Sequence, residues 1–560
     1  MWKILLALLM LALLLGGGGY AAYRGYKHVR QVRLVKQARA YLEKSNTRKA
    51  LLCVQRALSY NSRDLEACRL MAQLTEAARS PSALLWRSRV VELNPRSVED
   101  RLALTQTALS LRDYVSATNA LEGVDAAGKK TAGYHNIAGA VAAAANQPAQ
   151  AEAHFLEAVR LEPLNAAPQL NLAVVRLQST HAQSLDAARP ALQQISSNAT
   201  NAALRCQALR ELVTDAMRSK QTAAALALSK ELLQQTNSIF RDRLLRLDVL
   251  RETRSAEFKP LLAAYQHEAS SDPTNTARIS ELAMWQMAKT SPAETLAWLR
   301  TLPQDTQTNQ PVSLLVADCL MMRQDWRGLQ ASIDPQNWAE LEFLRRAYKA
   351  RALRGQDLSG AAKGEWELAL KAANGQRAGL VMLLRLAAQW NWQSEAEELL
   401  WSIVNQFPGE PWAVQALTQA LFVNGRTRPL LMFYSQQLKR TPADLGAKNN
   451  LAMTAFLLEA MEFKPHDLAR EVYEKAPTNA AYASTYAFSL LIQKKNTEAL
   501  QVMQRLTPQD LQNPSIAGYY GLVLKATGNG EKARSYLDWA FKAPMLPEEK
   551  KLFEKAKAGG

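Results

Sequence analysis

The stretch YHNIAGAVAAAANQPAQAEAHFLEAVRLEP, residues 134–163, decides the fold of this chain. It reads as two helices with small residues at Gly139 in the first and at Ala151 and Ala158 in the second. Two helix axes approach closely only where the side chains between them are small, so these positions mark where the helices touch. Phe155 is expected to fill the volume further out. The stretch therefore predicts one antiparallel helix pair.

The same pattern recurs along the chain with a period of about 34 residues, the length of a two-helix repeat. Pro163 follows the second helix, where a proline ends one helix pair and sets the turn to the next, and Ala173 stands one period after Gly139. Near the C-terminus, Ala487, Ala499, Met503 and Leu506 are followed one period later by Gly521, Ala533, Leu537 and Ala540. A period shared by two distant stretches is typical of a repeat protein.

These residues resemble the tetratricopeptide repeat (TPR), which combines small residues at the contact of two helices, an aromatic or aliphatic filler and a proline in the turn. The resemblance implies an all-α fold, a right-handed α-solenoid of TPR-like helix-turn-helix repeats. We expect an N-terminal array over residues 45–270 and a C-terminal array over 271–560. The C-terminal array is degenerate in its first half, and the boundary is placed at the polar cluster SSDPTN, residues 270–275.

Length and composition exclude several classes of function. A chain of 560 residues is too long for one hydrophobic core, which agrees with a repeat array. The four cysteines form no CxxC pair, and the six histidines form no ligand-spaced motif, so we expect no metal site and no cofactor. No nucleophile, base and orienting acid occur together, and the helix-pair pattern leaves no room for a second fold. We therefore expect no enzyme and no small-molecule substrate.

The N-terminus carries a candidate membrane anchor. Twenty residues from Ile4 to Tyr23 are without charge, and a helix of that length just crosses the hydrocarbon layer. Residues 1–23 are therefore interpreted as a transmembrane helix. The alternative is a signal peptide cleaved before Tyr20, because the dense apolar part is short and four glycines follow it.

A basic segment follows this span, and residues 24–44 are expected to form a juxtamembrane helix. Its cations recur every third residue, at Arg24, Lys27, Arg30, Arg33, Lys36 and Arg39. Each would be attracted to anionic lipid by about 1 kcal/mol, so these side chains are candidate lipid contacts. Because the more basic flank of a span stays in the cytoplasm, we expect a single-pass protein of the cell membrane with a cytoplasmic array. Cleavage would instead give a periplasmic or secreted array.

The TPR resemblance also implies partners. Family members usually bind peptide segments of other proteins in the concave groove formed by the first helices. The matching helices here offer Asn136, Asn171, Asn449 and Asn450, whose amides can hydrogen-bond an extended backbone. Nine of the twelve tryptophans lie between Trp285 and Trp412, and we interpret them as fillers of the degenerate repeats in preference to a groove lining.

The function expected from these features is a membrane-anchored scaffold for protein–protein interaction. The order of span, basic flank and repeats is similar to bacterial membrane-anchored TPR proteins of cell-envelope assembly. The alternative is a nucleic-acid-binding helical repeat protein, suggested by a net charge of +17. Subtracting the seven cations of residues 1–42 leaves only +10 on the rest of the chain, so nucleic acid is not expected as a partner.

Overall fold

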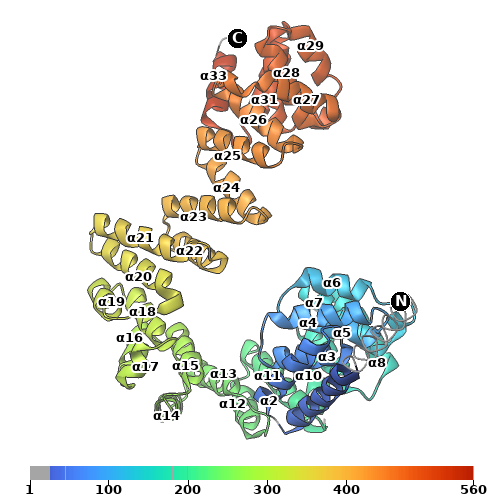
Figure 1. The fold of residues 1–560 in the computed structure, drawn as a ribbon, viewed down its shortest axis with the longest axis vertical. Coiled ribbons are helices and arrows are strands. Elements are labelled where there is room, and N and C mark those ends of the chain that lie inside the picture. The colour runs from blue at the N-terminus through green and yellow to red at the C-terminus, as the bar shows by residue number, and fades with distance from the viewer. Residues whose placement is uncertain (1–24, 45, 179–181, 199, 559–560) are drawn as a thin grey trace, which may run out of the picture. The chain divides into compact units, whose positions relative to one another are not determined.

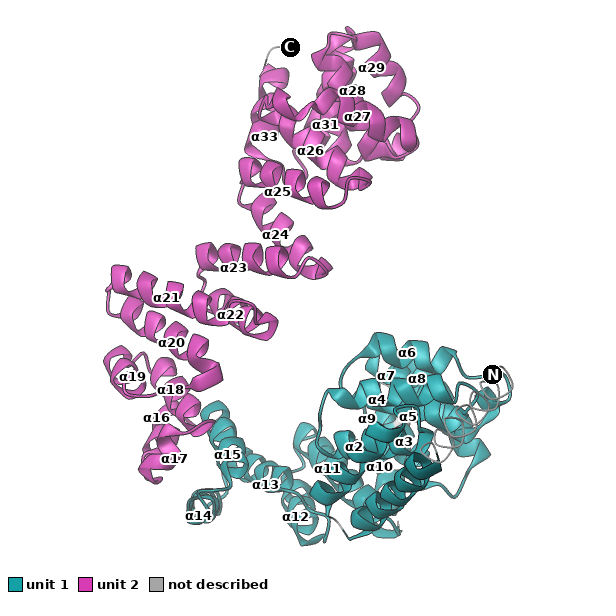
Figure 2. Cartoon of the chain, viewed as in Figure 1, with its two compact units in different colours: residues 1–289 teal, residues 290–560 magenta. Residues whose placement is uncertain are grey.

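The computed structural model describes residues 25–44, 46–178, 182–198 and 200–558, and throughout those ranges it consists of helices and turns without a strand. The chain divides into two compact units, residues 1–289 and 290–560 (Figure 2). The division falls after α15, C-terminal to the predicted polar boundary at 270. The all-helical repeat fold expected from the sequence is present.

Unit 1 is a series of helix pairs in which each helix packs against the one that follows (Figure 1). An unlabelled helix over 25–43 forms the first pair with α2 and shares a buried core with it around Ala38 and Val54. Each later pair consists of an odd-numbered first helix and the even-numbered helix after it. The helices are α2 Thr47–Tyr60, α3 Leu65–Ala77, α4 Ser82–Leu93, α5 Val98–Ser110, α6 Tyr114–Glu122, η1 Gly128–Lys130, α7 Ala132–Ala144, α8 Pro148–Leu161, α9 Ala166–Leu177, α10 Ala182–Asn198, α11 Ala202–Arg218, α12 Thr222–Gln234, α13 Phe240–Glu252, α14 Phe258–Ser271 and α15 Thr276–Lys289.

Unit 2 is also a series of helix pairs, with three additional α-helices that the repeat pattern did not predict. Two of them are the short helices α17 and α30, and the third is α33, which follows the last pair. The helices are α16 Pro292–Leu299, α17 Gln304–Thr308, α18 Val312–Met322, α19 Trp326–Ile333, η2 Ala339–Leu341, α20 Glu342–Gly355, α21 Ser359–Ala373, α22 Arg377–Gln389, α23 Gln393–Gln406, α24 Pro411–Val423, α25 Thr427–Arg440, α26 Leu445–Leu457, η3 Met461–Phe463, α27 Pro465–Lys475, α28 Ala480–Ile492, α29 Asn496–Met503, α30 Pro508–Leu511, α31 Pro514–Ala526, α32 Gly530–Ala540 and α33 Pro547–Ala558.

The helix contact predicted from residues 134–163 is formed by α7 and α8. Ala151 and Ala158 are fully buried, and Phe155 is 2% exposed. A Cβ atom placed on Gly139 would lie only 2.6 Å from Cε1 of Phe155, so the glycine lets the ring lie against the backbone of α7. Pro163 lies in the exposed turn between α8 and α9, and Ala173 is buried in α9.

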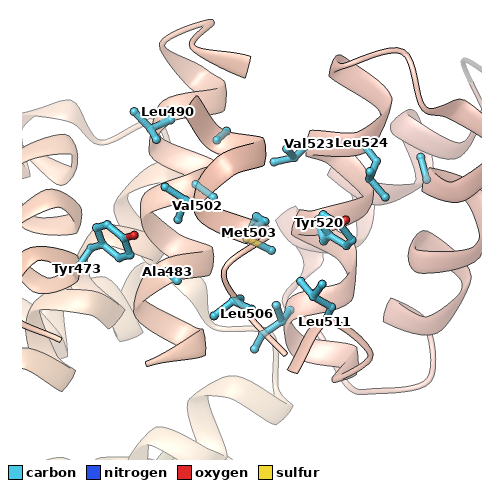
Figure 3. Close-up of a cluster of buried hydrophobic side chains, with 14 residues drawn as sticks. Tyr473, Ala483, Leu490, Val502, Met503, Leu506, Leu511, Tyr520, Val523 and Leu524 are labelled. Carbon is cyan, nitrogen blue, oxygen red and sulfur yellow. The ribbon is translucent and has the colours of Figure 1, made fainter. Parts of the chain in front are cut away.

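The second predicted stretch contributes to two buried hydrophobic clusters of unit 2, one of which is drawn in Figure 3. A Cβ atom on Gly521 of α31 would lie 2.8 Å from Cγ of Leu537 and 3.1 Å from the carbonyl oxygen of Ala533, both in α32. The helices α31 and α32 therefore touch through the glycine as α7 and α8 do. The other residues of the pattern are buried too, namely Ala487, Ala499, Met503, Leu506 and Ala540.

Side-chain caps start many of the first helices. Oδ1 of Asp64 accepts a hydrogen bond from the backbone N–H of Ala67 at 2.7 Å, and Oγ1 of Thr131 accepts one from Tyr134 at 3.2 Å. Such a cap stabilises a helix by about 0.5–2 kcal/mol because it satisfies an otherwise unpaired donor. Equivalent caps are supplied by Ser97, Asn165, Asn201, Asp444, Asn479 and Asn513.

Twelve of the turns that follow a first helix share one geometry. In α7 the backbone N–H of Gln147 bonds the carbonyl of Ala142 at 2.9 Å, and Asn146 between them is left-handed with φ 58°. This Schellman motif satisfies carbonyl groups at the helix end. Left-handed residues recur two positions after a first helix. They fall into three runs, and a run is a series of successive pairs in which these residues follow the period of the repeat: Arg79, Arg112 and Asn146; Lys220 and Arg254; and Gln324, Asp357, Asn391, Gly425, Glu459, Lys494 and Gly528.

Candidate interaction surfaces

Two of the predicted groove asparagines meet in unit 1. Asn136 in α7 and Asn171 in α9 lie on the first helices of successive pairs, which contact one another. Nδ2 of Asn171 donates a hydrogen bond to Oδ1 of Asn136 at 2.9 Å, and both side chains are half-buried. The bond orients both amides while each keeps further donor and acceptor capacity for a ligand.

The other two asparagines lie in unit 2 and differ from one another. Asn449 is buried in α26, and its Oδ1 has no hydrogen-bond partner among the described residues. Asn450 is exposed, and its Oδ1 accepts a hydrogen bond from Nδ2 of Asn449 at 3.3 Å. Of this pair, therefore, Asn450 is the one whose amide an external peptide could reach.

The predicted juxtamembrane segment is an integral part of unit 1. Gln31 and Ala38 of the helix over 25–43 are buried. Among the predicted lipid contacts, Arg39 pairs with Glu66, and Nε of Arg30 bonds the hydroxyl of Tyr26 at 3.0 Å. The exposed predicted contacts are Arg30, Arg33, Lys36 and Arg39, while Lys27 is half-buried, and Arg24 lies outside the described residues.

The predicted anchor also lies outside them, since residues 1–23 are not described. Within the ranges that are described, no helix combines the length and the apolar character that crossing a membrane requires.

Two histidines of the helix pair α7–α8 are in direct contact. Nδ1 of His135 lies 3.0 Å from Nδ1 of His154, and Tyr134 packs edge-on against both rings. One ring must donate and the other accept, so the contact requires at least one neutral imidazole. Burial lowers the pKa of His154 most, and the neighbouring His135 lowers it further. His154 is therefore neutral at physiological pH. Nowhere in the described ranges do three or more His, Cys, Asp or Glu side chains gather as metal ligands.

In unit 2, an arginine is surrounded by tryptophans. Arg351 of α20 lies with its guanidinium carbon 4.9 Å from the ring centre of Trp326, 6.0 Å from that of Trp390 and 5.9 Å from that of Trp392. The three rings come from the turns at the starts of α19 and α23 and the end of α22. We call these four residues the Arg351 cage. The sequence offers one signal for it, the tryptophan-rich segment, although the repeat pattern favours core fillers there.

That interpretation describes some of the tryptophans. Trp285, Trp366 and Trp392 are buried, whereas Trp326 and Trp390 are half-buried and Trp412 is 38% exposed. The segment therefore contains both core residues and residues that reach the surface.

The C-terminal helix α33 lies against several of the pairs before it. Phe553 occupies the space left by Gly518 of α31, where a Cβ atom would overlap the ring. Thr427 at the start of α25 donates a hydrogen bond to Glu548. Between α33 and the ends of α26, α28 and α31 lies a groove of about 910 Å³ with a largely apolar lining that includes Phe456 and Leu522.

The repeated pairs, with glycine and alanine at their contacts and a left-handed residue after each first helix of a run, define a TPR-like helical repeat protein. The handedness of the solenoid stays a prediction. No family model and no curated protein matches the chain.

Several solved structures are similar over part or most of the chain. PilF of Pseudomonas aeruginosa is 15% identical and covers 40% of this chain and 99% of its own, with a TM-score of 0.31. The structure of Naa15/Naa10 bound to HypK-THB is 13% identical, and the match covers 95% of this chain and 78% of the matched chain, with a TM-score of 0.30. PilW, described as a type IV pilus biogenesis factor, is 15% identical, and the match covers 42% of this chain and 92% of PilW, with a TM-score of 0.26. At these scores the likenesses carry no argument about this chain.

Proposed function

We propose that this chain is a membrane-anchored scaffold that binds segments of other proteins along the first helices of its repeats. The observation that carries the proposal is the hydrogen-bonded pair Asn136 and Asn171. Successive first helices place two amides side by side, half-buried and held by one another. A pre-oriented amide binds a peptide backbone with a smaller loss of side-chain entropy than a mobile one.

The membrane part of the proposal rests on the sequence. Residues 1–23 supply the anchor, and the exposed cations Arg33 and Lys36 lie on the helix that directly follows it. Anionic lipid would attract these side chains in addition to the anchor. We place the array in the cytoplasm and the process in cell-envelope assembly, as the bacterial membrane-anchored TPR proteins suggest.

Site-specific photo-crosslinking in cells tests this function. A photoreactive amino acid replaces Asn136 or Asn171 in the full-length chain, and crosslinked proteins are identified by mass spectrometry. The control position is Leu156, which is exposed on α8, the second helix of the same pair. We expect the same partner at both asparagine positions and its absence at Leu156. Crosslinks of equal yield at all three positions would contradict a binding face on the first helices.

A further inference from the structure

Helix α20 carries five basic side chains, and four of them are paired with carboxylates. These pairs are Arg345 with Glu342, Arg346 with Glu342 and Glu365, Lys349 with Asp334 and Glu365, and Arg354 with Glu395. Arg351 is the fifth. Within the part of the chain that the structure describes, no carboxylate and no hydrogen-bond acceptor contacts its guanidinium. A half-buried cation without an acceptor is unfavourable, so its environment requires an explanation.

The three tryptophans account for only part of the environment of Arg351. The faces of the indole rings attract the cation of Arg351, but they do not replace the hydrogen-bond acceptors that its N–H groups lose on leaving water. Nε is enclosed and without a partner, whereas the two Nη atoms are not enclosed. The cage therefore holds the guanidinium in place and leaves the edge of its fork that carries the Nη atoms open to an acceptor from outside.

We propose that the Arg351 cage binds a carboxylate side chain, an aspartate or a glutamate, of a partner protein. A guanidinium fork matches the two oxygens of a carboxylate, and a water-excluding surround strengthens such a bond. The protein source of the carboxylate rests on the proposed scaffold function, while the site itself rests on the geometry of the cage.

The local charge favours a carboxylate over a phosphate. Arg354 lies next to Arg351 and stacks on the ring of Trp392, with its guanidinium carbon 3.7 Å from the ring centre, but Glu395 already neutralises it. One uncompensated positive charge remains, which matches the single negative charge of a carboxylate. A phosphate dianion would need a second free cation in the cage.

Fluorine NMR of the full-length chain with 5-fluorotryptophan in place of tryptophan tests the site. The probes are a glutamate blocked by an acetyl and an amide group, the corresponding blocked glutamine, and inorganic phosphate. Single Trp→Phe variants assign the resonances of Trp326, Trp390 and Trp392. We expect a saturable shift of these three resonances with blocked glutamate and no saturable shift with the other two probes. Phosphate causing the larger shift, or glutamine an equal one, would overturn the assignment to a carboxylate.

Variants separate binding from a structural role. Arg351→Met should reduce the shift with blocked glutamate at least about tenfold, since one charge-assisted bond accounts for a factor of this order. Because it removes an unpaired half-buried cation, the variant should melt at or above the parent temperature. Arg385→Met, which removes an exposed arginine of α22, should leave the shift unchanged.

Two outcomes would refute the cage as a carboxylate site. The first is a shift that persists in Arg351→Met, and the second is a parent chain whose three resonances do not respond to blocked glutamate. Either outcome leaves the crosslinking test of the first helices unaffected, because Asn136 and Asn171 lie in unit 1 and the cage lies in unit 2.

Discussion

Replacing Gly139 by alanine should destabilise the α7–α8 pair, although alanine is the better helix former. The substitution gains about 1 kcal/mol in helix propensity. Against this, the new Cβ atom would lie 2.6, 2.7 and 2.9 Å from three ring carbons of Phe155, where ordinary contacts lie at about 3.5–4.0 Å. The ring is enclosed, so the two helices must separate by about 1 Å to restore such contacts. Overpacking of this kind costs about 1–3 kcal/mol, and with the gain subtracted we expect a net loss of about 1 kcal/mol.

Replacing Phe155 perturbs the same contact from the side of α8. Phe155→Ala alone should cost about 3–5 kcal/mol, as for other buried aromatic residues. In the double variant the methyl group added at position 139 enters the space that the ring has left. The combined loss should therefore be smaller than the sum of the two single losses by about 1–3 kcal/mol.

Hydrogen exchange of the full-length chain, read from peptides of α7 and α8, measures these losses locally, because each pair is stabilised mainly by its neighbours. The control is Gly133→Ala at the exposed start of α7, where the added Cβ atom would lie 3.5 Å from Leu102, an ordinary contact. This control should leave protection unchanged or raise it. If Gly139→Ala protects α7 as much as Gly133→Ala does, the close approach at Gly139 is refuted.

Three further outcomes are expected. The folded-state pKa of His154 lies below its ordinary value of 6.5, so below that pH the unfolded chain binds more protons than the folded chain. Protection of α7–α8 from hydrogen exchange should therefore be lower at pH 5.5 than at pH 7.5. His154→Gln, whose amide oxygen can still accept a hydrogen bond from His135, should remove this pH dependence. Lys494→Gly should raise the stability of α28–α29 by roughly 0.5–1 kcal/mol in the same assay, because φ at this position is 63°. Left-handed backbone costs a non-glycine residue about 1–2 kcal/mol. Part of the gain is lost because glycine has more conformational freedom in the unfolded chain. A reporter active only outside the cytoplasm, fused after Gly560, should be silent, and activity or a mature chain beginning at Tyr20 would contradict the cytoplasmic array.

The contacts that the sequence could predict are those within one helix pair. The spacing from Gly139 to Phe155 is the same as that from Gly521 to Leu537, and in both pairs this spacing alone places a small residue opposite a filler. The period of the repeat follows from the same contacts, because each pair must bury the same faces against its neighbours.

Contacts between pairs were not predictable in this way. The Arg351 cage joins residues that are distant in the sequence, and its three tryptophans come from two turns, Trp326 from the one at the start of α19 and Trp390 and Trp392 from the one between α22 and α23. The packing of α33 was missed for a related reason, since Gly518 and Phe553 lie outside the repeat pattern. Such contacts depend on how pairs stack, and a periodic pattern gives no information about which side chains meet across a stack.

The left-handed turns show which part of the repeat carries the information for folding. Twelve turns share one backbone geometry, yet arginine, asparagine, lysine, glutamine, aspartate, glutamate and glycine all occupy the left-handed position. A non-glycine residue there costs about 1–2 kcal/mol, so the turn sequence by itself does not specify the turn. The two helices must impose it, because their contact fixes where the first helix ends and the second begins. This explains why small residues at helix contacts identified the repeat, whereas glycines in the turns would have identified only two of the twelve.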